Sequence, residues 1–125
     1  MQVVYDELYE HFIKVVPKAK SYCDPLIAAD GVDKSDGMHW YFGVYVVPFI
    51  EHIGDNKEVV TMMQIASFIE MVETSGQEDI AGVIEQSVME ALWDRRRDLV
   101  YKYWSLWGEY TKAAFDVVGE YIKQI

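Results

Sequence analysis

Two glutamates, Glu70 and Glu73, have a type and spacing that could support acid–base chemistry. Three residues apart on a helix, they share a face, where one carboxyl group can donate a proton and the other accept one. The same spacing is typical of an ordinary solvated helix face, which is the simpler interpretation. We therefore expect no enzyme and keep a carboxylate-pair enzyme as a competing hypothesis.

The other reactive residue types form no recognisable constellation. The sequence contains three histidines, which are His11, His39 and His52. None lies four residues from another, and only Asp36-x-x-His39 comes near the Glu-x-x-His pairs of di-iron bundles. Cys23 has no CxxC partner, and the neighbouring Asp24 should raise the pKa of its thiol. We expect no catalytic residue, no metal ion and no cofactor. A single cysteine also favours a reducing, cytoplasmic location.

The segment "SGQEDIAGVIEQSVMEALWDRRR", residues 75–97, carries only acidic charges until it reaches three arginines. A helical wheel at about 100° per residue divides it into two faces. The expected core face holds Ile80, Val83, Ile84, Ser87, Val88, Ala91 and Leu92. The opposite face holds Glu78, Asp79, Gly82, Glu85, Gln86, Met89, Glu90 and Trp93. That second face combines acids with two large apolar side chains.

Two interpretations of this face stay open. Protein interfaces are enriched in aromatic residues and Met, so Trp93 can anchor a partner while the acids steer a basic one. Alternatively, Trp93 folds under a neighbouring helix with Met89 beside it. The candidate partner-binding residues are Glu78, Asp79, Glu85, Glu90 and Trp93, with Asp94, Glu73, Asp55 and Glu58 as second choices.

The charge of the chain is concentrated in its middle third. The net charge is −10, and residues 51–94 contain ten acids but only one base, Lys57. Such a field repels nucleic acid and attracts basic partners, although it can also simply keep a protein soluble. Arg95, Arg96 and Arg97 oppose a helix dipole, so we expect them to pair with acids and not to bind nucleic acid directly.

Helical periodicity recurs along the chain and strand signals are weak. We expect helices over 2–16, part of 18–37, 38–53, 57–74, 78–93 and 95–123. Pro48 should kink or break the third of these near 45–47. The N-terminal "MQVVYDELYE" lacks the pattern of a signal peptide, and "WYFGVYVVPFI" is too short to span a membrane. The sequence predicts an all-α domain over residues 1–125, a bundle of five or six helices with a long C-terminal helix.

The C-terminal segment has the widest apolar face. One stripe contains Leu99, Tyr103, Leu106, Tyr110, Ala113, Val117 and Tyr121. A face this wide predicts helices packed on two sides, within the chain or in part against a second copy.

Residues 38–94 carry a pattern of features along three helices. These features are His39, Gly54-Asp55-Asn56, Phe68-Ile69-Glu70, Ser75-Gly76-Gln77-Glu78 and Glu90-Ala91-Leu92. In these features the chain resembles small all-helical immunity proteins of bacterial toxin systems, including contact-dependent growth inhibition. The resemblance implies a helical fold that binds and neutralises a cognate toxin domain, and it carries over no catalytic residue. Many such toxins are nucleases with basic substrate channels, which an acidic protein can occupy. The alternative is a helical adaptor or regulatory module that neutralises nothing.

Overall fold

The computed structural model describes residues 2–123, and throughout that range the chain forms helices and no strand. The α-helices are α1 (Leu8–Val15), α2 (Pro17–Asp30), α3 (Met38–Trp40), α4 (Val47–Asp55), α5 (Val59–Thr74), α6 (Glu78–Val83), α7 (Glu90–Arg95), α8 (Arg97–Lys102) and α9 (Glu109–Lys123). The 3-10 turns are η1 (Tyr5–Glu7), η2 (Lys34–Asp36) and η5 (Trp104–Leu106). Two π-helices, η3 (Tyr41–Val46) and η4 (Ile84–Met89), join α3 to α4 and α6 to α7 without interruption. The all-α prediction is confirmed.

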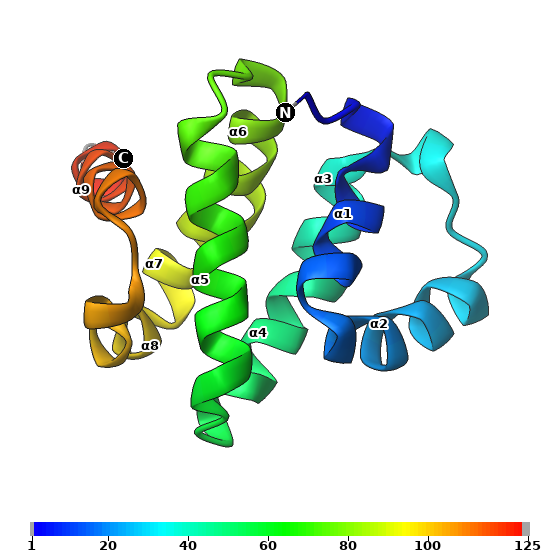
Figure 1. Ribbon diagram of the computed structural model, residues 1–125, viewed down its shortest axis with the longest axis horizontal. Coiled ribbons are helices and arrows are strands. Elements are labelled where there is room, and N and C mark those ends of the chain that lie inside the picture. The colour runs from blue at the N-terminus through cyan, green and yellow to red at the C-terminus, as the bar shows by residue number, and fades with distance from the viewer. Residues whose placement is uncertain (1, 124–125) are drawn as a thin grey trace.

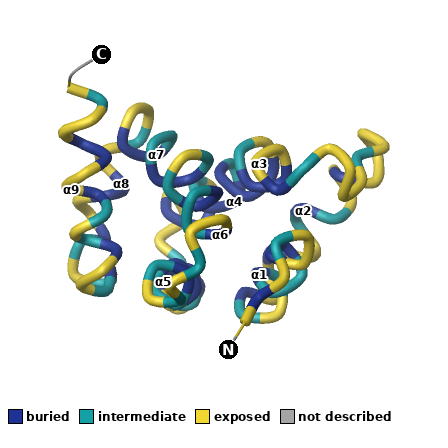
Figure 2. The backbone as a smooth tube through the Cα atoms, turned by 90° about the horizontal axis from the view of Figure 1, so that it is seen from above, coloured by how far each residue is buried: buried dark blue, intermediate teal, exposed yellow. Residues whose placement is uncertain are grey.

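Helix α5 stands at the centre of the bundle, with α1 on one side and α9 on the other (Figure 1). It also contacts α4 and α6. Its buried residues lie within about half of the circumference at 100° per residue, and they are Thr61, Met62, Ile65, Ala66, Phe68, Ile69 and Val72. The other side of α5 leaves Val59, Val60 and Met63 exposed. Helix α9 lies at the edge of the molecule away from α1 and α2 (Figure 2).

Pro48 produces the predicted irregularity in a specific form. It stands at the start of α4, directly after the π-helix η3. Proline has no backbone N–H to donate to the carbonyl of Val44, so the regular α-helical ladder is interrupted there. A π-helix, with its i→i+5 hydrogen bonds, absorbs such an interruption without ending the helix. The chain therefore runs from Met38 to Asp55 as one continuous, irregular helix.

The second π-helix, η4, packs against the first and changes which residues face the core. Gly43 of η3 lies opposite Ser87 of η4, and His39 Nδ1 is 2.7 Å from Ser87 Oγ. A wheel at about 100° per residue loses register across a π-helix, because its turns hold more residues. Met89 and Trp93 are therefore buried, at 0% and 8% exposure, where the wheel placed them on the acidic outer face. The docking-anchor interpretation of Trp93 is wrong, and the alternative, burial beneath a neighbouring helix, is confirmed.

The C-terminal segment is not one helix from 95 to 123. It divides into α8, the turn η5 and α9, and Trp107 has an extended backbone between the last two. The predicted stripe is correspondingly wrong in its second half. In α9 the buried residues are Thr111, Phe115, Val118 and Gly119. The residues of the predicted stripe that lie in α9 are exposed, and they are Tyr110, Ala113, Val117 and Tyr121.

Trp93 fits against α9 because residue 119 is glycine. A Cβ atom on Gly119 would lie 2.8 Å from Cζ2 of Trp93, closer than carbon atoms can pack. The indole has little freedom to move, since it also contacts the rings of Tyr101 and Phe115 and the guanidinium of Arg97. The close approach of α7 and α9 therefore depends on this glycine.

We predict that Gly119→Ala destabilises the protein by about 1–3 kcal/mol, because the added methyl group overpacks the Trp93 site. Gly82→Ala is the matched control, since nothing lies within 4 Å of a Cβ atom at Gly82 in helix α6. The control should be neutral or stabilising by up to about 1 kcal/mol, because alanine is the better helix former. Urea denaturation of both variants measures the difference. Equal stabilities would show that α7 and α9 do not pack this closely.

Candidate functional site

A groove runs between the second π-helix region and α9, and we call it the acidic groove. It is lined by Glu85, Gln86, Glu90, Val117, Val118 and Tyr121, and has a volume of about 690 Å³. One wall, from η4 and α7, carries two carboxylates and an amide. The other wall, from α9, is apolar, with Val117 69% and Tyr121 54% exposed. The structure thus combines acids and apolar side chains on one surface, but supplies the apolar part from a different helix than the sequence predicted.

Glu73 adds a further carboxyl group beside this wall. Burial, followed by the like charge of Glu85 and a side-chain interaction with it, raises the Glu73 pKa from 4.5 to about 8. Glu73 Oε1 is buried and has no hydrogen-bond partner among the described residues. Two facing carboxyl groups cannot both ionise cheaply, so a proton or an external cation stabilises the pair.

The remaining acids of this region carry uncompensated charge. Glu78 and Asp79 are exposed in the first turn of α6, and Asp94 is exposed near the end of α7. Together with Glu85 and Glu90 they make five acids, and none forms an ion pair with another described residue. Most of the candidate partner-binding acids therefore keep their charge available to a partner.

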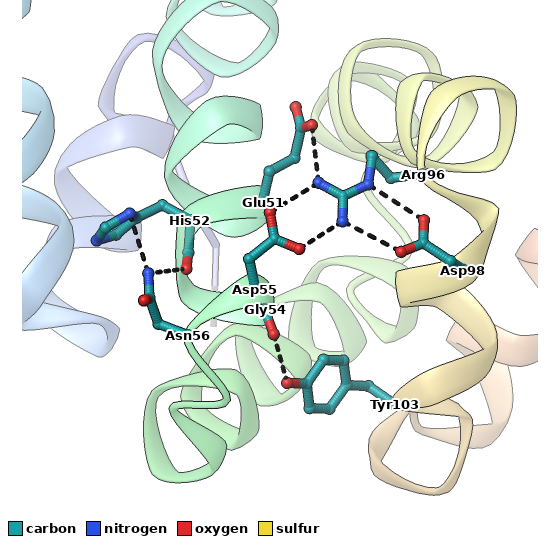
Figure 3. A network of polar contacts seen from close by, with 8 residues as sticks. All are labelled: Glu51, His52, Gly54, Asp55, Asn56, Arg96, Asp98 and Tyr103. Atoms are coloured by element: carbon teal, nitrogen blue, oxygen red, sulfur yellow. Dashed lines mark hydrogen bonds and ion pairs between the residues drawn. The ribbon is translucent and has the colours of Figure 1, made fainter.

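Asp55 and Glu58 belong to a different part of the molecule. Asp55 receives two hydrogen bonds from the Arg96 guanidinium, at 3.0 and 2.5 Å, and Arg96 also contacts Glu51 and Asp98 (Figure 3). These bonds hold the pKa of Asp55 below its usual value. Glu58 forms an ion pair with Lys18. The structure separates both acids from the groove, because Glu58 precedes α5 and Glu73 lies at its other end, roughly 22 Å away at 1.5 Å per residue.

The arginine run has a structural role. Arg96 is the centre of the network in Figure 3, and Arg95 lies 3.6 Å from Glu51. The prediction that these two arginines pair with acids is confirmed. Arg97 instead donates to the Trp93 carbonyl at 3.0 Å and places its guanidinium over the Trp93 ring.

Glu70 is a helix cap. Its carboxylate accepts hydrogen bonds from the backbone N–H groups of Tyr110 and Thr111, at 3.2 and 2.9 Å, and from the Thr111 hydroxyl at 2.8 Å. These are the orphan donors at the N-terminus of α9. Burial alone would raise the Glu70 pKa, but the Thr111 and Tyr110 hydrogen bonds outweigh it and hold the pKa below 4.5. Glu70 is thus held as a structural anion, whereas the Glu73 carboxyl has the charge of Glu85 beside it.

Other reactive groups are accounted for by packing. Burial, assisted by Asp24, raises the pKa of the Cys23 thiol to about 12, which confirms the predicted direction. His39 and Ser87 form a close nucleophile-and-base pair that sequence spacing could not reveal, and it joins α3 to the π-helix η4. Among residues 2–123, no three His, Cys, Asp or Glu side chains are grouped to hold a metal ion. No helix within the same range has both the length and the apolar composition needed to cross a membrane.

Sequence reasoning missed the apolar wall of the groove. It assigned Val117 and Tyr121 to the core because it treated 95–123 as one helix. The signal that could have corrected this is "WGE", residues 107–109, where glycine precedes a glutamate that opens a helix.

Over the described residues the fold is all-α, and its candidate functional site is the acidic groove. Comparisons of the chain with protein-family models, with curated proteins and with solved structures found no match.

We predict that Glu73→Gln stabilises the protein at alkaline pH. The raised pKa means that the folded state favours protonated Glu73, so wild-type stability falls as pH rises from about 4.5 to about 8. A glutamine never ionises, so the variant should gain about 1–2 kcal/mol at pH 9, a value reduced from the full shift because Glu73 is partly exposed, and little at pH 4. Denaturation from pH 4 to 9 measures this, with Glu78→Gln as the exposed control. A gain that does not depend on pH would contradict the Glu73–Glu85 pairing.

We predict that Glu70→Ala destabilises the protein by about 1–2 kcal/mol at pH 7, because it leaves the first donors of α9 without an acceptor. The lowered pKa makes this contribution present above about pH 4.5 and lost as pH falls below it. Glu109→Ala removes a charge from the same helical turn without removing an acceptor, and should cost only about 0.3–1 kcal/mol. Urea titrations of the two variants at pH 7 and pH 3 compare them, and equal costs at pH 7 would refute the capping role.

Proposed function

We propose that this chain is an immunity protein, which binds a cognate toxin domain at the acidic groove and neutralises it. The observation that carries the proposal is the groove itself, where Glu85 and Glu90 face exposed Val117 and Tyr121. Such a surface offers both charge complementarity and apolar burial to a basic protein partner. The toxin as the partner rests on the resemblance of residues 38–94 to bacterial immunity proteins.

The charge distribution supports a basic partner over a neutral one. Asp55 and Glu58, which lie between α4 and α5 at the end of one helix and the start of the other, are neutralised internally by Arg96 and Lys18. The five acids Glu78, Asp79, Glu85, Glu90 and Asp94 form no ion pair with a described residue. Uncompensated acids raise the association rate with a basic protein, and the contacts within the groove set its dissociation rate. A nuclease is the toxin class that fits best, because its substrate channel is basic and an acidic protein can occupy it in place of phosphates.

The first test is growth rescue. The C-terminal domain of the protein encoded immediately upstream of this chain is expressed from an inducible promoter, with and without the chain. Arrest by the domain alone and growth in the presence of the chain support the proposal. A domain that is harmless, or that arrests growth equally in both strains, overturns it and favours an adaptor that binds a cellular protein.

We predict that Glu85→Lys/Glu90→Lys weakens binding of that domain by about 100-fold, because it reverses the charge of the groove wall. Asp6→Lys/Glu7→Lys is the matched control, since it changes the net charge equally at two exposed residues of the first turn of the chain. The control should retain affinity within about threefold at physiological salt, where charges far from the interface are screened. Isothermal titration calorimetry measures both, with circular dichroism to verify folding. Equal losses would mean that net charge alone, and not the groove, determines binding.

A further inference from the structure

Helix α9 exposes an apolar stripe that the fold leaves uncovered. It consists of Tyr110, Ala113, Val117 and Tyr121, spaced at three, four and four residues. The stripe follows one side of the helix for about 16 Å at 1.5 Å per residue. Tyr110, Val117 and Tyr121 are 62%, 69% and 54% exposed. An apolar row at helical spacing on a surface helix is unusual for a face in contact only with water.

This stripe borders the acidic groove. Val117 and Tyr121 belong to both, and Val118 forms the floor between them and the core at 6% exposure. Across the groove stand Glu85, Gln86 and Glu90, with Glu73 beside Glu85. The groove therefore has an apolar wall and an acidic wall, both made by helices.

We infer that the acidic groove accepts a basic amphipathic helix of the partner, whose apolar side chains pack on Val117 and Tyr121 while its Lys or Arg side chains reach Glu85 and Glu90. This inference rests on the proposed function, since it specifies which part of the partner is recognised. It assigns the anchoring role to α9, in place of the buried Trp93.

The walls of the groove favour a partner segment that is a helix. Two neighbouring helices leave a furrow that a third helix fills by inserting its side chains between theirs. An amphipathic helix laid in such a groove presents its own apolar anchors, at i, i+3, i+4 and i+7, to the apolar wall. The groove volume of about 690 Å³ is sufficient for several side chains but not for a folded domain.

The acidic wall of the groove favours a partner segment that is basic. Glu85 and Glu90 line this wall and form no ion pair with a described residue, so an incoming guanidinium or ammonium group would supply their counter-charge. A second copy of this chain fits poorly, because two molecules of net charge −10 would bring their acidic walls together. An anionic membrane surface is disfavoured by the same charge.

The test uses a synthetic amphipathic peptide of about 18 residues, with leucines on one face and lysines on the other, so that it spans about 27 Å as a helix. A peptide of identical composition in scrambled order serves as the ligand control. Binding is measured by fluorescence anisotropy at physiological salt, and helix formation by circular dichroism. We expect the ordered peptide to bind about tenfold or more tightly than the scrambled one and to gain helicity on binding.

Val117→Glu/Tyr121→Glu separates groove docking from general charge attraction. The variant adds two negative charges, so nonspecific attraction would strengthen binding, whereas loss of the apolar wall weakens it by about tenfold or more. Val60→Glu/Met63→Glu makes the same chemical change at exposed residues of α5, 72% and 53% exposed, and should not weaken binding. Both sites are exposed, so both variants should keep wild-type helicity and melting behaviour.

Three results would overturn the inference. Equal strengthening in both variants would show that only charge attracts the peptide. A concentration-dependent dimer that Val117→Glu/Tyr121→Glu abolishes, seen by sedimentation velocity, would identify a second copy as the occupant. Growth rescue that survives Val117→Glu/Tyr121→Glu would keep toxin neutralisation as the function but place the docking surface outside the acidic groove. Conversely, peptide binding in the groove without growth rescue would retain the inference and reject the toxin.

Discussion

The Glu70 carboxylate at the N-terminus of α9 is the contact on which the C-terminal half of the structure depends. It links α5 to a helix forty residues further along the chain and satisfies three donors at once. Gly108 permits the approach, because a Cβ atom there would lie 2.2 Å from the Glu70 Cδ atom. With its first turn fixed, α9 buries Phe115 and Val118 and leaves Val117 and Tyr121 outward. The apolar wall of the groove is thus a consequence of where the helix starts.

The acids of residues 51–94 fall into three groups with different surroundings, which composition alone cannot separate. Those near the start of α5 neutralise Arg96 and Lys18, and Glu70 caps a helix. Those from Glu73 onward have no described cation to neutralise, and burial together with the charge of Glu85 raises the pKa of Glu73. A protein gains no stability from such a set, because like charges repel in the folded state. These acids therefore do not stabilise the fold.

Sequence reasoning succeeded where a local rule governs the structure. The irregularity before Pro48 and the ion pairs of Arg95 and Arg96 each follow from a few neighbouring residues. It failed where the helical phase changes without a local marker. The π-helix at 84–89 has no proline in it, so nothing in the pattern warned that Met89 and Trp93 would turn inward. The break before α9 was missed because Leu106 and Tyr110 continue the apolar spacing across it. The contact that determines the break, Glu70 with Gly108, is distant in sequence.

Because of the π-helix η4, one continuous helical segment turns Trp93 toward the core and Glu85 and Glu90 toward the groove. Once η4 has turned Trp93 inward, Gly119 can approach its ring, and α9 closes against α7. Glu85 and Glu90 keep their outward direction along the same segment and contribute little to the core. Substitutions at Trp93 or Gly119 therefore disturb the fold, whereas substitutions at Glu85, Glu90, Val117 or Tyr121 alter a surface at small cost to stability. These groove residues can therefore vary without loss of the fold, because Trp93 and Gly119, which hold α7 against α9, do not line the groove.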